Sequence, residues 1–225
     1  MWKIIILRGY LKYIICLLFL SLFYFSAAGP LLPDNEYSVY ETNDKGKVGK
    51  IEVKLTKDST GYHITYISDR RVEAILDTEN LQTIYLNKII KEKWELSVKK
   101  NDVIEVNYQG RKSFYKETEP VYDRHTLDFV LRSFIYYPGF KKRIRLLVPE
   151  FMIINADLEI IGEDSVTTPA GVFDCWKIMM KPRVVFTRIK FYFYIEKKFP
   201  HRFVKLLDSS RKSSIILKGY ESTIF

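Results

Sequence analysis

The stretch 50-KIEVKLT-56 alternates polar and apolar side chains without interruption. Successive side chains of an extended strand point to opposite faces, so a period of two predicts a strand with one buried and one solvated face. The stretch 93-KWELSVK-99 repeats the pattern, and the same period dominates the chain from Tyr37 onward. The sequence therefore predicts a mostly β protein.

Short polar linkers separate the strand candidates, for example DKG at 44–46 and QG at 109–110. Linkers of this kind favour hairpins, and consecutive hairpins build an antiparallel meander. Segment 184–196 is the longest candidate, and we expect it to be a central strand that bends with a strongly curved sheet. The expected strands are 50–56, 61–67, 71–77, 82–89, 93–99, 102–108, 155–162, 172–180, 184–196, 202–207 and 213–220.

One segment, 126–137, has a different period. Its apolar residues are spaced at i, i+3, i+4, i+7 and i+8, which is typical of an amphipathic helix. Asp123 or Thr126 can cap the first turn, and the Pro-Gly pair at 138–139 ends the helix. We therefore expect one domain at 29–225, in which a strongly curved antiparallel sheet, an incomplete barrel, packs on this single helix. The apolar stripe consists of Leu127, Val130, Leu131, Phe134 and Ile135.

The N-terminal segment 1–28 has the layout of a secretory signal. Three basic residues lie within 1–12, the uncharged stretch 13–25 is apolar, and Ser26-Ala27-Ala28 supplies small residues for a peptidase. The apolar stretch is shorter than the roughly 20 residues that span a bilayer. We expect export to the periplasm or cell envelope. The sequence leaves two alternatives for the leader: it is cleaved, or it stays and anchors the chain to the membrane.

Charge and cysteine content exclude several classes of function. The formal net charge is +9, but lysine and arginine alternate with acids along the strands. This pattern is typical first of a solvated face, and second of a patch that associates peripherally with anionic lipid or an envelope polymer. We expect no nucleic-acid partner for such an exported chain. Cys16 lies in the leader, so the mature chain holds only Cys175 and forms no internal disulfide.

No catalytic motif stands out. His63, His125 and His201 lie far apart in the sequence, and a single mature cysteine gives no metal-ligand spacing. Cys175 lies within a predicted strand, where a buried, inert thiol is expected. We expect no enzyme, no metal site and no cofactor.

Three stretches resemble the bacterial envelope family known as domain of unknown function 3108. They are Tyr37-Ser38-Val39 followed by Gly46 and Gly49, the segment 167-TTPAGVFDCWK-177, and the run 191–205 with its FPHRF sequence. More loosely, the chain resembles the periplasmic lipoprotein carriers. That resemblance implies an incomplete barrel that shelters acyl chains, a hydrophobic ligand, and a lid role for the helix at 126–137.

Two functions follow as hypotheses. In the first, a non-catalytic envelope protein binds a lipid, an acyl chain or a lipidated protein in an apolar cavity between sheet and helix. In the second, a structural or assembly factor with a filled core acts through contacts with another envelope protein. The candidate lining, which either encloses a ligand or packs against itself, is Val130, Leu131, Phe134, Ile135, Ile189, Phe191 and Phe193.

Overall fold

The computed structural model describes residues 32–223 with gaps at 91–92, 118, 151 and 185–187. The predicted signal segment 1–28 lies outside the described residues, so its cleavage or retention stays a prediction. Leu31–Phe225 is a compact unit, and both hydrophobic cores are built from its residues alone, as expected for a segment that folds on its own. Within the described ranges, no helix combines the length and apolar character needed to cross a bilayer.

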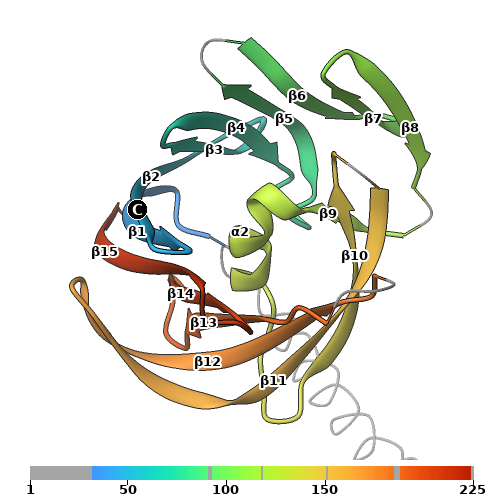
Figure 1. Ribbon diagram of the computed structural model, residues 1–225. Helices are drawn as coiled ribbons and strands as arrows, with labels where there is room; N and C mark the ends of the chain where they lie inside the picture. Colours follow the sequence, from blue (N-terminus) through green and yellow to red (C-terminus); the bar gives the residue numbers. More distant parts are fainter. Residues whose placement is uncertain (1–31, 91–92, 118, 151, 185–187, 224–225) are drawn as a thin grey trace, which may run out of the picture. The chain divides into compact units, whose positions relative to one another are not determined.

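The described strands form one sheet of 15 strands, which curls around a short helix (Figure 1). Its first half contains β1 (Asn35–Asp44), β2 (Lys47–Asp58), β3 (Gly61–Ile67), β4 (Arg70–Leu76), β5 (Thr83–Ile90), β6 (Lys93–Lys100), β7 (Val103–Tyr108) and β8 (Arg111–Lys116). Its second half contains β9 (Val121–Asp123), β10 (Lys141–Val148), β11 (Met152–Thr168), β12 (Gly171–Pro182), β13 (Phe191–Glu196), β14 (Phe203–Asp208) and β15 (Ser213–Thr223).

The strand order follows the chain in two meanders joined by the pairing of β1 with β15. Neighbouring strands are antiparallel, as predicted, except that β9 pairs with β10 in parallel. A parallel pair needs a crossover, and here the helical segment between β9 and β10 supplies it. The sheet is not closed by hydrogen bonds, because β8 and β9 are its two edges.

The predicted strand at 184–196 is wrong in its first half. β13 begins only at Phe191, which pairs with Met180 of β12, and the described residues between the two strands, 183–184 and 188–190, belong to no strand. Alternation of side chains does not distinguish such a connection from a strand. The longest strand is instead β11. The list of expected strands missed β1 and β9, and it also missed β8 and β10, whose sequences are rich in lysine and arginine.

The helix is shorter than predicted. A 3-10 turn, η1 (Arg124–Thr126), leads into α2 (Leu127–Arg132), and the chain leaves the helix at Ser133 rather than at Tyr137. The Ser133 amide and hydroxyl both donate to the Val130 carbonyl, at 3.1 and 2.8 Å, which tightens and ends the last turn. Asp123 caps the start by accepting from the His125 amide at 2.7 Å.

Two hydrophobic cores hold the curled sheet together. The larger core surrounds α2, and Ile144 and Leu146 of β10 contribute to it. The smaller core lies on the other face of β10, where Leu147 packs with the inward side chains of β4 to β7 such as Leu86 and Val98. The sheet therefore closes on itself by side-chain packing where backbone pairing stops.

A buried ion pair fixes the helix inside this curl. The guanidinium of Arg132 donates to both carboxylate oxygens of Glu36, at 2.9 and 2.6 Å, and to the Pro200 carbonyl at 3.0 Å. Glu36 also accepts from the hydroxyls of Ser38 and Tyr220. The Arg132 and Glu36 side chains are only 1% and 2% exposed. Through these hydrogen bonds, the pair joins α2, β1, β15 and the turn before β14.

We expect Arg132→Met to destabilise the protein by about 3–5 kcal/mol, because it leaves the Glu36 carboxylate buried without a counter-charge. Urea-induced unfolding measures the change. Arg143 donates to Asp157 at the surface, and Arg143→Gln is the matched control with an expected loss of about 0–1 kcal/mol. Equal losses in the two variants would contradict the anchoring role of Arg132.

Candidate ligand cavity

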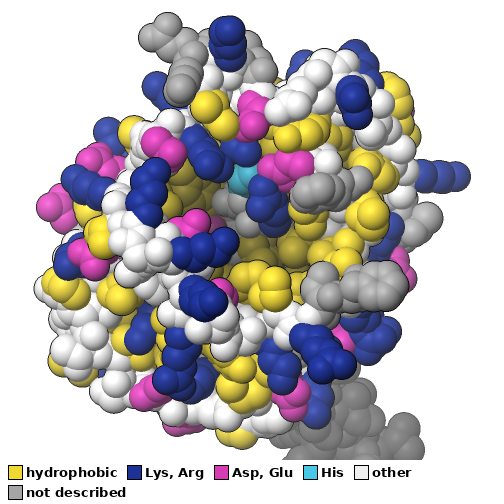
Figure 2. Space-filling view, in the orientation of Figure 1, with side chains coloured by type: hydrophobic (Ala, Val, Ile, Leu, Met, Phe, Trp, Pro, Cys, Tyr) yellow, Lys and Arg dark blue, Asp and Glu magenta, His cyan; other side chains and the backbone are white. Residues whose placement is uncertain are grey.

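A cavity of about 670 Å³ opens between the first strands, the start of the helix and the last strands. This volume lies within the range of about 300–1,000 Å³ that is typical of small-molecule sites. Figure 2 shows the hollow, with hydrophobic side chains lining it and both basic and acidic side chains around its mouth. The apolar lining is Tyr40, Ile51, Val53, Tyr66, Val72, Leu127, Leu146, Val148, Ile154, Met180, Pro182, Phe191, Phe193, Phe203, Leu206 and Ile215.

Strand periodicity builds this lining. Ile51 and Val53 lie on the inward face of β2, with Leu55 buried further along the same face. Phe191 and Phe193 occupy the corresponding face of β13 on the other side of the cavity. The space stays open because α2, six residues long, reaches only about 9 Å along its axis.

The structure brings together only part of the predicted lining. Phe191 and Phe193 line the cavity, whereas Val130 and Leu131 are fully buried in the larger core and do not line it. The predicted stripe assumed that the helix covers the sheet with one face. Instead the helix is enclosed on nearly all sides, so its stripe is used for packing and its first turn faces the cavity.

The remaining predicted residues lie away from the cavity. Phe134 packs edge-on against Tyr136, and together with Phe140 they form an aromatic cluster beyond the helix. Because the helix has ended before Ile135, that side chain is 87% exposed. Ile189 is 50% exposed, since it lies in the connection before β13.

Polar side chains gather at one part of the lining: Ser68, Arg70, Lys88, Arg124, His125 and Asp128. Lys88 lies 2.8 Å from Glu95 and 3.4 Å from Glu150, and Arg124 donates to Glu150. Burial raises the pKa of Glu150, but the hydrogen bond from Arg124, a backbone hydrogen bond and the charges of Arg124 and His125 together lower the pKa below its ordinary value. These two cations are therefore neutralised by carboxylates behind the lining.

Asp128, in the first turn of α2, is the one carboxylate among the described residues of the lining. Burial raises the pKa of Asp128 to about 6, against the opposing effects of the Tyr66 hydrogen bond and the Arg132 charge. The Tyr66 hydroxyl donates to it at 2.7 Å. The sequence alone did not identify Asp128 as a cavity residue, because its position at the cavity depends on where the helix lies.

Cys175 and the histidines lie in separate surroundings. Burial, together with the negative charges of Glu196, Asp174 and Asp164, raises the pKa of the Cys175 thiol to about 12. His63 contacts Asp58, His125 contacts Asp123, and His201 contacts the Glu196 carbonyl. Over the described ranges, no group of three or more His, Cys, Asp or Glu side chains is placed to hold a metal ion.

No protein-family model matches the sequence, and no curated protein matches it. The resemblance to domain of unknown function 3108 is therefore not supported by a family match. Among solved structures, the chain is similar to a β-barrel-like protein of domain of unknown function 1849 from Brucella abortus. The TM-score is 0.55 at 7% identity, and the match covers 85% of this chain and 99% of that chain. This likeness shows a barrel-like fold.

Weaker likenesses lead to two further solved proteins. One is described as a candidate lipoprotein from Parabacteroides distasonis, with a TM-score of 0.35, 14% identity and coverage of 85% of this chain and 98% of that chain. The other is described as a candidate exported protein with a YmcC-like fold from Bacteroides fragilis, with a TM-score of 0.34, 12% identity and coverage of 86% and 98%. These TM-scores are too low to establish a shared fold.

The raised pKa of Asp128 implies that the stability of the fold depends on pH. Its pKa is higher in the folded chain than the ordinary 3.8, so the folded state holds the proton more tightly and stability falls as the pH rises from about 4 to about 6. We expect Asp128→Asn, which keeps an acceptor for Tyr66, to stabilise the protein by about 1–2 kcal/mol at pH 7.5. The gain should vanish near pH 4. Urea unfolding at pH 4 and pH 7.5 measures the change in the free energy of unfolding. An equal gain at both pH values would contradict the raised pKa of Asp128.

Proposed function

We propose that this protein is a non-catalytic protein of the periplasm or cell envelope that binds a hydrophobic ligand in the cavity. The ligand class is a lipid, an acyl chain or a lipidated protein. The observation that carries the proposal is the open space of about 670 Å³ with its predominantly apolar lining. Protein interiors are normally close-packed, so an apolar space of this size has its clearest use when a ligand fills it.

The chemistry of the lining favours an apolar ligand. Burying apolar surface is favourable by about 25 cal/mol per Å², and the energy is not directional, so a flexible chain can use it along its whole length. The aromatic rings of Phe191, Phe193 and Phe203 lie in the lining. Polar side chains are a minority of the lining, so most of its surface favours contact with an apolar chain.

The proposed location rests on the N-terminal segment. Its basic start and the apolar stretch 13–25 support export, with the remainder of the chain outside the cytoplasm. Cleavage after Ala28 would release the domain, whereas retention would anchor it to the membrane. Both forms place the cavity in the envelope, where acyl chains are available.

The alternative is a structural or assembly factor whose core is filled and which works through an envelope protein partner. The open cavity favours ligand binding over this alternative. The deciding experiment is native mass spectrometry of the protein purified from its own envelope. We expect adduct masses of one amphiphile per chain, and a clean apo mass under gentle ionisation would contradict the proposal.

A matched pair of variants tests the position of the ligand. Ile215 of β15 lines the cavity, and the adjacent Ile216 lies on the opposite face of the same strand. We expect Ile215→Trp to fill the space and to lower the adduct population at least tenfold. Ile216→Trp should leave it unchanged. Thermal unfolding of both variants controls for misfolding, and equal adduct populations would argue against this cavity.

A further inference from the structure

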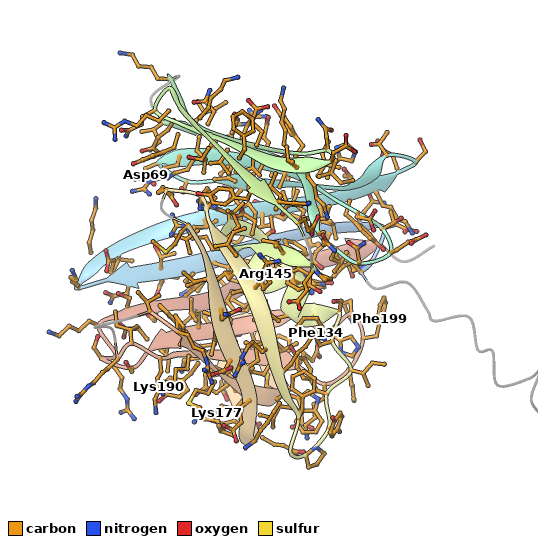
Figure 3. All side chains as sticks on the ribbon, turned by 90° about the vertical axis from the view of Figure 1, so that its right-hand side faces the viewer. Asp69, Phe134, Arg145, Lys177, Lys190 and Phe199 are labelled. Atoms are coloured by element: carbon orange, nitrogen blue, oxygen red, sulfur yellow. The ribbon has the colours of Figure 1, made fainter. Side chains whose placement is uncertain are left out.

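The mouth of the cavity differs in chemistry from its interior. Ser68, in the turn between β3 and β4, and Arg70, the first residue of β4, both line the cavity. Ser68 fixes this turn, because its hydroxyl accepts from the Arg70 amide and lies 3.2 Å from the Arg70 carbonyl. In Figure 3, Asp69 of the same turn lies at the upper left of the molecule, and Phe199 lies at the right. The cavity is therefore polar at the end near this turn.

Arg70 is the least compensated cation of the lining. Its nearest carboxylate is Asp69, whose oxygen lies 3.8 Å from the Arg70 Nε, beyond hydrogen-bond distance, and the side chain is 53% exposed. Over the described ranges, its guanidinium makes no hydrogen bond. Lys88 and Arg124 have carboxylate partners, as described above. Arg70 thus presents the fork of donors that matches a carboxylate or a phosphate.

Among the described lining residues, one side chain, that of Asp128, carries a carboxylate. Asp128 would repel an anion placed against the helix. An amphiphile with a negative head group therefore has one favourable orientation, with its head at the β3–β4 turn and its chain among the aromatic rings.

We infer that the ligand is a single-chain amphiphile with an anionic head group, and that Arg70 binds this head at the cavity mouth. The inference rests on the proposed function, since it assigns the head of a ligand whose chain occupies the cavity. A carboxylate and a phosphate monoester share the required chemistry: a compact anion with oxygens that accept two parallel N–H bonds.

Arg71 supplies the matched control. It follows Arg70 on β4, but its side chain points to the opposite face, where it pairs with Glu73 at 2.5 Å. Arg71→Gln and Arg70→Gln therefore remove the same charge from neighbouring positions, and only one of the two faces the cavity. Arg70→Lys keeps the charge and loses the paired donors.

The test is calorimetric titration of the 31–225 segment with amphiphiles that share one saturated chain and differ in head group. The heads are a carboxylate, a phosphate monoester, a primary alcohol and a quaternary ammonium, each below its critical micelle concentration. We expect one or both anions to bind about tenfold to a hundredfold more tightly than the alcohol. The anion that binds more tightly identifies the head group as a carboxylate or as a phosphate monoester.

Arg70→Gln should remove this preference while the affinity for the alcohol stays unchanged. Arg70→Lys should keep part of the preference, and Arg71→Gln should keep all of it. Equal affinity for anions and alcohol in the unmodified protein, or equal effects of Arg70→Gln and Arg71→Gln, would overturn the head-group assignment alone. Failure of every probe, the alcohol included, would overturn the proposed function as well.

Discussion

The ion pair between Arg132 and Glu36 is the contact on which the arrangement of this molecule depends. A charge that leaves water must find a partner, and these two side chains find each other at the centre of the curled sheet. The pair fixes the end of α2 to β1, and it forms further hydrogen bonds with the Tyr220 hydroxyl and the Pro200 carbonyl. With its last turn held there, the short helix directs its first turn, with Leu127 and Asp128, toward the cavity.

The cavity follows from this anchoring and from the way the sheet closes. A sheet that curls without joining its edges needs another contact, and Leu147 of β10 provides one by packing against the inward face of β4 to β7. The enclosed volume is then set by strand number and curvature, while the helix that enters it is only six residues long. Packing is complete around Arg132 and incomplete toward the β3–β4 turn, so one end is core and the other is cavity.

Several elements could be predicted because their signals are local. The strand 61–67 coincides with β3, and the alternation at 50–56 correctly placed Ile51 and Val53 on the inward face. The helix at 126–137 was placed correctly but made too long, since Ser133 ends it through contacts with Val130. Of the candidate lining, Phe191 and Phe193 face the cavity, whereas Ile135 and Ile189 face solvent.

The sequence by itself determined the class of fold, the antiparallel hairpins, the single helical segment and the apolar character of one face. These properties depend on side-chain period and turn chemistry, which act over a few residues. Only the tertiary structure decided that Arg132 is buried, that Arg70 faces the cavity and that a space remains open. Glu36 and Arg132 are 96 positions apart, and such a pairing is set by the curvature and register of the whole sheet.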